Sequence, residues 1–266
     1  MTRATHRSPE RPRPTHAAGR IEVARAGGCV TATLTWPAAR NGARNRLTAA
    51  MARQLVELAE EVEDDADARM LVIRAAGGYF CAGFDDDVDS IAPMVVESIA
   101  VLSKPTLAII DGGAADEGME LALATDLRVA ARSARFTMGQ LKRGRLPRFG
   151  GTQRLPRLIG AAHALRMLLT GAAPDGAEAM RLGLVTYVAP SHALARVAGE
   201  VVRSVISRGP IAAALAKEAV RKGCDLTLDQ GIRLEEDLYA LLQTTADRAE
   251  GVRAFLDKRK PLFRGA

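Results

Sequence analysis

The stretch "KPTLAIIDGGAADEGMELALATDLRVA" at residues 104–130 decides the fold class. It begins with the apolar run of a buried strand, passes two glycines, and takes up helical spacing near Asp116. After the helix, "DLRVAARSARFTMG" (126–139) has the pattern of a pair of strands. A strand, a turn, a helix and further strands in this order predict an α/β fold.

Acidic residues stand where the helix of this stretch begins. Glu117 and Glu120 are three residues apart, so they share one helical face and lie a turn from each other. Carboxylates in a first helical turn stabilise the helix dipole, and they can also be solvated or carry chemistry. The remaining motifs have to decide between these roles.

The chain before this stretch continues the alternation of strands and helices. Residues 21–36 have the pattern of two strands joined by a turn at Gly27-Gly28, and "ARMLVIRAAG" (68–77) that of a buried strand. Between them, apolar residues at helical spacing follow Thr48, which we expect to be the N-cap of a helix. These elements fit the same α/β class.

The chain becomes almost purely helical after "GLVTYVAP" (183–190). The turn residues of "SRGP" (207–210) interrupt this helical part. We therefore predict an α/β core at residues 21–206 and a helical C-terminal region at residues 207–266.

The basic charge is concentrated at the N-terminus. Residues 1–20 contribute a net charge of +4 to the chain's +6. They are rich in Pro and Arg and poor in apolar residues, so we expect a disordered basic tail. A nucleic-acid-binding arm is disfavoured, because no aromatic residue interleaves the arginines.

Several protein classes are excluded by what the sequence lacks. No run of about 18 apolar residues occurs, and no apolar core of a secretion signal is found, so we expect a cytoplasmic protein without a membrane span. Cys29, Cys81 and Cys224 are odd in number and far apart, which predicts reduced thiols and no metal site. The glycine fingerprints of dinucleotide sites and phosphate loops are absent.

Five motifs, taken in order, resemble the crotonase family of enoyl-CoA hydratases and isomerases. They are "YFCAGFD" (79–85), "KPTLAIIDG" (104–112), "MELALATDLRVA" (119–130), "GGTQRLPRLIG" (150–160) and "FLDKRKPLF" (255–263). The resemblance extends from about Ile21 to the C-terminus. It implies a crotonase-like superhelix of β-β-α turns, followed by a helical trimerisation region at 207–266, and hence a homotrimer or homohexamer.

The resemblance also implies the chemistry of a site that acts on an acyl-CoA thioester. Two backbone N–H groups, at Ala82 and at position 117, would meet the enolate-like oxygen that forms on the thioester, and Glu120 would move protons. Neither a metal nor a redox cofactor is implied, since coenzyme A arrives as part of the substrate. The residues expected to hold coenzyme A are Arg46, Ala82, Phe84, Asp85, Phe255 and Lys258; the motif around Arg46 falls on 45–47, with Asn41-Gly42 as the alternative.

The sequence departs from the family pattern at several positions. Glu117 stands where the family has glycine, and Gln140 stands where hydratases carry a second glutamate. An amide can orient water, but it cannot take a proton from it. Acidic residues crowd 85–89, and the segment between Asp85 and Lys104 is shortened. Basic residues crowd the segment after Gln140, namely Lys142, Arg143, Arg145 and Arg148.

These departures leave three accounts open. In the first, Glu120 acts alone and the protein is an isomerase or another one-base enzyme. In the second, Glu117 supplies the missing carboxylate. In the third, the protein is a non-catalytic acyl-CoA-binding member of the family. We further predict that a basic residue of the run at 142–148 pairs with Glu117, because an unpaired acid in an anion-binding site is costly.

Overall fold

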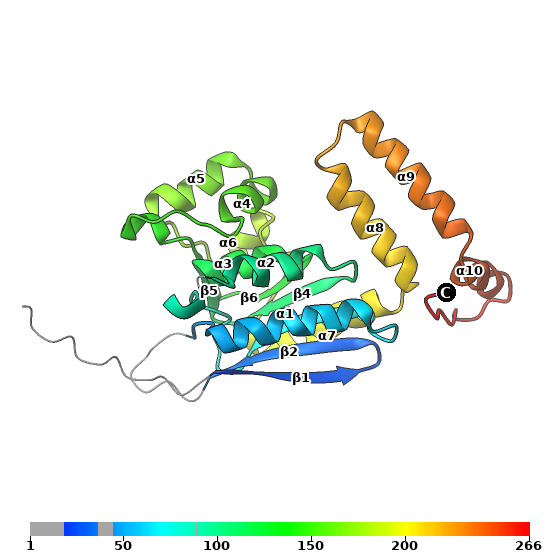
Figure 1. Ribbon diagram of the computed structural model, residues 1–266, viewed down its shortest axis with the longest axis horizontal. Helices are drawn as coiled ribbons and strands as arrows, with labels where there is room; N and C mark the ends of the chain where they lie inside the picture. The colour runs from blue at the N-terminus through cyan, green and yellow to red at the C-terminus, as the bar shows by residue number, and fades with distance from the viewer. Residues whose placement is uncertain (1–18, 37–44, 89) are drawn as a thin grey trace, which may run out of the picture.

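The computed structural model describes residues 19–36, 45–88 and 90–266 of the chain. The larger sheet runs in the order β1 (Arg20–Ala26), β2 (Cys29–Thr35), β3 (Met70–Ala75), β4 (Thr106–Ile110), β6 (Leu127–Ala131) and β8 (Tyr187–Ala189). The pair β1–β2 is antiparallel and every later pair is parallel. The α/β class is therefore confirmed (Figure 1).

The antiparallel pair forms where the sequence predicted it. Gly27 and Gly28 have φ values of 56° and 84°, which L-residues with a side chain rarely adopt, and they close a two-residue turn between Ala26 and Cys29. Strand β1 begins at Arg20, one residue inside the predicted tail. Gly19 is also described, and residues 1–18 of that tail lie outside the described residues.

The helices lie on both faces of the sheet and beyond one end of it. Helix α1 lies in front of the sheet in Figure 1 and α7 lies behind it. Thr48 caps α1 as predicted, since its hydroxyl accepts a hydrogen bond from the Met51 N–H at 3.3 Å. The helix bounds are α1 (Ala49–Asp64), α2 (Ala92–Val101), α3 (Glu117–Ala124), α4 (Gly151–Ile159), α5 (Ala161–Thr170), α6 (Gly176–Arg181), α7 (Ser191–Ile206), α8 (Pro210–Gly223), α9 (Leu228–Gln243) and α10 (Ala246–Leu256).

The strands predicted at 126–139 form, but they pair with different partners. Strand β6 joins the large sheet between β4 and β8, whereas β7 (Arg135–Thr137) pairs in parallel with β5 (Gly113–Ala115). A turn closed by the Ala134 N–H and the Ala131 carbonyl, 3.0 Å apart, carries the chain from one sheet to the other. The small sheet matters for function because α3 begins directly after β5.

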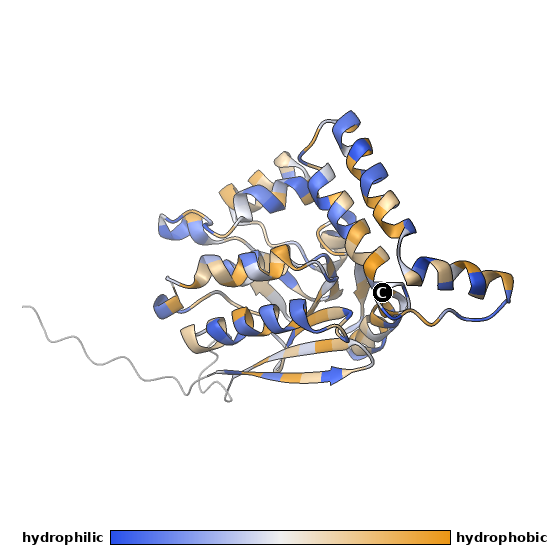
Figure 2. Ribbon diagram, turned by 45° about the vertical axis from the view of Figure 1, so that its right-hand side comes forward, coloured by the Kyte–Doolittle hydropathy of each residue, from blue (hydrophilic) through white to orange (hydrophobic). Residues whose placement is uncertain are grey.

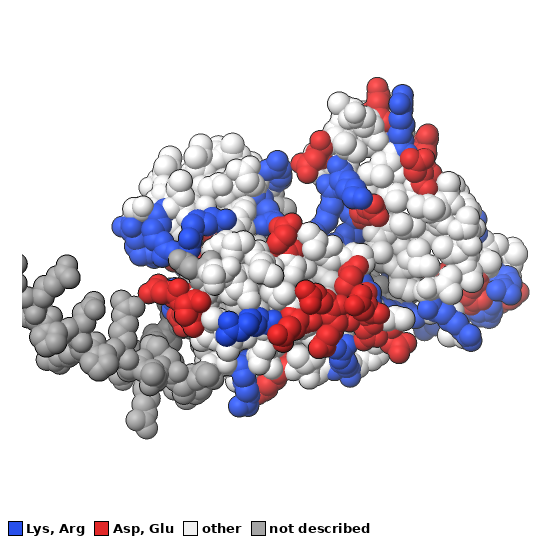
Figure 3. All heavy atoms as spheres, viewed as in Figure 1, with Lys and Arg blue, Asp and Glu red and all other residues white. Residues whose placement is uncertain are grey.

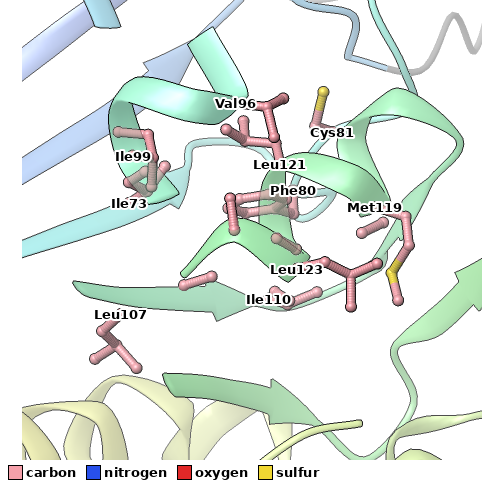
Figure 4. Close-up of a cluster of buried hydrophobic side chains, with 14 of the residues drawn as sticks. Ile73, Phe80, Cys81, Val96, Ile99, Leu107, Ile110, Met119, Leu121 and Leu123 are labelled. Carbon is pink, nitrogen blue, oxygen red and sulfur yellow. The ribbon is translucent and has the colours of Figure 1, made fainter. Parts of the chain in front are cut away.

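The hydrophobic core fills the space between the large sheet and helices α1, α2 and α3. Phe80, Ile73, Leu107 and Leu121 are buried in it (Figure 4). Figure 2 shows hydrophobic residues along the strands and on helix sides that face them. All eight residues of α3 are buried, so both of its glutamates are held inside the protein.

The C-terminal helices α8 and α9 form a hairpin that projects from the core (Figure 1). None of the residues of α8 is buried. The helix is tied to the core at Asp126, whose carboxylate pairs with Lys217 and Arg221, each at 2.8 Å. The break between α7 and α8 lies at 207–209, and the role of this region in oligomerisation stays a prediction.

Candidate active site

The site is built around the N-terminus of α3. Asp116 precedes the helix with φ 52° and ψ −121°, a positive-φ conformation that costs a residue with a side chain. Its carboxylate holds this turn in place, because one oxygen accepts from the Gly139 N–H at 2.6 Å and the other pairs with Arg143 at 2.9 Å. The loop from β7 is thereby fixed against the start of α3.

Glu117, the first residue of α3, turns its side chain inward. The residue is 6% exposed, and its Oε2 accepts from the Phe84 N–H at 3.4 Å. Its Oε1 lies 4.0 Å from Arg145 Nη2. The predicted pairing of Glu117 with the basic run is therefore confirmed, and Arg145 is the partner. Arg143 pairs with Asp116 instead, and Figure 3 shows acidic and basic groups side by side at this end of the molecule.

The backbone donor predicted at Ala82 is engaged elsewhere. The Ala82 N–H donates to the Asn45 carbonyl at 2.6 Å, so it is not free for a substrate oxygen. The prediction for this N–H is wrong, because residues 82–85 run parallel to the segment 45–47, and the Ala82 and Asp85 N–H groups both donate to carbonyls of that segment. The donor that faces the start of α3 is Phe84 N–H, two residues further on.

Glu120 lies one turn further along α3 and is fully buried. Its Oε1 accepts two backbone hydrogen bonds, from Phe149 at 2.7 Å and from Gly151 at 2.8 Å. Burial raises the pKa of this carboxyl above its ordinary value of 4.5, and the two N–H groups partly oppose that effect. The nearby Glu117 charge raises the pKa further. A carboxyl group in these surroundings is suited to exchanging protons.

Gln140, the first residue of the short 3-10 helix η2 (Gln140–Arg143), lies beside Glu120. Its Nε2 donates to Glu120 Oε2 at 3.4 Å. Its Oε1 is buried and has no hydrogen-bond partner within the described residues. The position predicted for a second acid/base group thus holds a neutral amide, whose Oε1 can still accept a hydrogen bond.

The residues that hold Glu120 were not predicted individually. Gly151 is the first residue of α4 and belongs to the recognised motif at 150–160, and Phe149 directly precedes that motif. The sequence did not show that the N–H groups of these two residues bind Glu120. Gly151 is the sequence feature that could have indicated this contact with Glu120. A Cβ at this position would come within 2.5 Å of Met138 Cε and 2.9 Å of Glu120 Oε1, so only glycine fits without a shift. Phe149 also stacks on Phe84, with ring centroids 5.8 Å apart.

A cavity of about 510 Å³ opens beside the start of α3. The residues of the predicted coenzyme A set that line it are Arg46 and Ala82. Arg46 is fixed by Asp85 at 3.0 Å and by the Phe84 carbonyl. The alternative at Asn41-Gly42 lies outside the described residues. The other lining residues are Ala115, Asp116, Thr137, Met138, Gly139, Lys142, Arg143 and Gly171.

The structure does not bring Phe255 and Lys258 to this cavity. Phe255 lies on α10, and Lys258 lies just after this helix. In space, α10 is at the opposite end of the molecule from β5 and α5 (Figure 1). The Phe255 side chain is largely exposed. Within one chain these two residues are therefore separate from the site.

Two further findings concern residues 19–36, 45–88 and 90–266. No group of three or more His, Cys, Asp or Glu side chains in these ranges is placed to bind a metal ion. No helix among them combines the length and the apolar character that crossing a membrane requires.

Known proteins resemble this chain in both sequence and structure. The family model described as enoyl-CoA hydratase/isomerase matches residues 30–266. Methylglutaconyl-CoA hydratase of Rattus norvegicus, a mitochondrial protein, is 36% identical over 239 residues, which cover 84% of this chain and 76% of the relative. The 2,3-dehydroadipyl-CoA hydratase of Escherichia coli is 35% identical over 243 residues, covering 88% of this chain and 94% of the relative.

Solved structures agree with these matches. An enoyl-CoA hydratase from Bacillus anthracis superposes with a TM-score of 0.87 at 34% identity, covering 93% of this chain and all of that one. The crotonase-like superhelix expected from the motifs is thereby confirmed. The long family match, the two relatives and this superposition all lead to one conclusion: the chain belongs to the enoyl-CoA hydratase/isomerase family.

Proposed function

We propose that the chain is a hydratase-type lyase or an isomerase that moves protons on the acyl group of an acyl-CoA thioester, with Glu120 as the acid/base. The observation that carries this proposal is the state of Glu120: a fully buried carboxyl with a raised pKa, one oxygen of which is fixed by two backbone N–H groups. Such fixation leaves Oε2 as the oxygen that exchanges the proton.

The start of α3 supplies the electrostatic part of the mechanism. The N–H of residue 117 belongs to the first turn of the helix, where N–H groups have no carbonyl of the same helix to bond. Together with Phe84 N–H it forms a pair of donors for the thioester oxygen, on which negative charge develops when a carbon-bound proton is removed or water adds. Glu120 then takes the proton and returns it to carbon.

The neighbouring amide favours a one-base reaction. Gln140 Oε1 can accept a hydrogen bond from water, but an amide does not remove the proton. In an isomerase, Glu120 takes a proton from one carbon of the acyl group and delivers it to another. In a hydratase, the same carboxylate has to deprotonate the water and protonate the α-carbon.

Two assays separate these reactions. Loss of enoyl absorbance with crotonyl-CoA reports hydration, and gain of that absorbance with a β,γ-unsaturated acyl-CoA reports isomerisation. The panel includes an enoyl-CoA with a terminal carboxylate, since two relatives are named for acyl groups of that kind. We expect Glu120→Gln to lower turnover by about 10² or more, in line with general acid–base catalysis.

The control variant is Glu22→Gln, which changes an exposed glutamate on β1. It should keep wild-type turnover. An unchanged turnover number in Glu120→Gln would refute the role of Glu120. Binding of acyl-CoA without turnover of any compound in the panel would instead support the alternative, a non-catalytic acyl-CoA-binding protein.

We also propose that the protein is a homotrimer or homohexamer. Large apolar side chains remain exposed along α8–α10, among them Leu228, Tyr239 and Phe255. Because Phe255 and Lys258 lie far from the cavity of their own chain, any contact they make with coenzyme A would be to the site of another copy. The cytoplasmic location stays a prediction, since curated relatives include mitochondrial and bacterial proteins.

A further inference from the structure

We propose that the Glu117 carboxylate competes with the substrate's thioester oxygen for the Phe84 N–H. Residue 117 would then determine how much more tightly the site binds an acyl-CoA than free coenzyme A. The inference rests on the proposed acyl-CoA function, and it concerns a residue that the family pattern does not contain.

The Glu117 side chain occupies the place next to the donor. A Cβ built on Gly83 would lie 2.6 Å from Glu117 Oε2 and 2.9 Å from Arg46 Nη1. The carboxylate is therefore pressed against the backbone of Gly83 and Phe84, beside the N–H that a thioester oxygen needs. A second oxygen cannot approach the Phe84 N–H closely while the carboxylate stays there.

The contacts that hold this carboxylate are long. Its distance to the Phe84 nitrogen is 3.4 Å, whereas charge-assisted N–H···O bonds are usually about 2.7–2.9 Å. Its distance to Arg145 is 4.0 Å, although only 8% of the Glu117 side chain is exposed to water. Because the carboxylate is buried and has few other partners, losing the Phe84 N–H costs it free energy.

Arg145 is the group that receives the displaced carboxylate. Its side chain is 42% exposed, so it is not locked in the core, and it is already the cation near Glu117 Oε1. When a thioester oxygen takes the Phe84 N–H, Glu117 turns toward Arg145. The hydrogen bond that the thioester gains at Phe84 is then largely offset by the one that Glu117 loses, so the thioester gains little from this donor in the wild-type protein.

Glycine at position 117 removes the competitor. In Glu117→Gly the Phe84 N–H is free, and the thioester oxygen gains a hydrogen bond with no loss elsewhere. Free coenzyme A lacks the thioester oxygen, so the same substitution leaves its affinity unchanged. The ratio of the two dissociation constants therefore isolates the effect at the donor from changes in the rest of the coenzyme A contact.

The experiment is a calorimetric titration of the full chain with coenzyme A and with butyryl-CoA. We expect the ratio Kd(coenzyme A)/Kd(butyryl-CoA) to be about tenfold higher in Glu117→Gly than in the wild type, as one or two hydrogen bonds allow. Glu117→Gln retains the shape with a neutral acceptor, and it should raise the ratio about two- to threefold. Glu22→Gln, which removes a distant exposed charge, should leave the ratio unchanged.

A ratio that stays within twofold of the wild-type value in Glu117→Gly overturns the inference, even if both ligands bind well. Should Glu117→Gly not fold, Glu117→Gln decides, and an unchanged ratio in that variant overturns the inference in the same way. If neither ligand binds the wild type, the proposed acyl-CoA function fails and the inference fails with it. An unchanged ratio with both ligands bound overturns the inference but leaves the proposed acyl-CoA function standing. The failure of the inference can therefore be distinguished from the failure of the proposed function.

Discussion

Gln140 donates its Nε2–H to Glu120 Oε2 at 3.4 Å, while its own Oε1 is buried without a partner within the described residues. A neutral amide, rather than a second carboxylate, thus lies beside the buried acid. Burial remains the main influence on Glu120 and raises its pKa. The raised pKa makes the stability of the protein depend on pH in a defined direction.

The first prediction concerns that dependence. Because the pKa of Glu120 is higher in the folded chain than its ordinary value of 4.5, the folded state binds this proton more tightly than the unfolded state. The contribution of this bound proton to the unfolding free energy is present below pH 4.5 and is lost as pH rises through the raised pKa of Glu120 in the folded chain. Glu120→Gln, neutral throughout, should therefore gain unfolding free energy relative to the wild type over this window.

Urea unfolding at a series of pH values from about 4 to about 8 measures this difference. Glu22→Gln serves as the control, because it removes a glutamate whose side chain is exposed rather than buried. A difference between Glu120→Gln and wild type that stays constant, or falls with rising pH, would show that burial does not raise the pKa of Glu120.

The second prediction concerns Cys81, which is fully buried and donates to the Gly83 carbonyl at 3.2 Å. Burial raises the pKa of its thiol to about 12, so almost no thiolate forms at pH 8. In Cys224→Ser, which lacks the exposed cysteine, a thiol-specific reagent should modify no residue rapidly in the native protein. Fast labelling of Cys81, located by peptide mass spectrometry, would contradict the burial described above.

The third prediction concerns Asp126, which links α8 to the core. Its carboxylate pairs with Lys217 at 2.8 Å and accepts from the Thr106 N–H at 2.7 Å. The Lys217 side chain is 9% exposed, and burial lowers its pKa. Asp126→Asn leaves this ammonium group without its carboxylate, so we expect a loss of about 3 kcal/mol in unfolding free energy.

Urea unfolding also tests this link, with Asp225→Asn as the matched control. Asp225 is 71% exposed in its pair with Arg157, and losing such a pair should cost less than about 1 kcal/mol. Adding Lys217→Met to Asp126→Asn should restore part of the lost stability, because the unpaired charge is then removed. Equal losses in the two single Asp→Asn variants would argue against a structural role for Asp126.

The fourth prediction concerns the apolar surface of α9. Leu228 is 79% exposed and Leu241 is 57% exposed, which is costly unless another surface covers them. We expect sedimentation equilibrium at micromolar concentration to show a trimer or a hexamer of the 28.3 kDa chain. Leu241→Glu should shift the mass toward the monomer, whereas Leu165→Glu on α5 should not. A wild-type monomer would count against an oligomer formed by α8–α10.

The sequence by itself determined the elements and the chemical character of the site. Apolar runs, glycine turns and the Thr48 cap located the strands and α1, because these signals act over a few residues. The spacing of Glu117 and Glu120 placed both carboxylates on one side of α3 for the same reason. The motifs, in their order, also determined the family.

Only the tertiary structure decided which groups meet. Phe84 rather than Ala82 faces α3, because the segment 45–47 takes the Ala82 N–H. The N–H of Phe149 binds Glu120 across 29 residues of sequence, and Arg145 reaches Glu117 across 28. Contacts between residues so far apart in sequence are set by how β5, β7 and the turn before α4 pack against α3. The spacing of residues along one element does not indicate that packing.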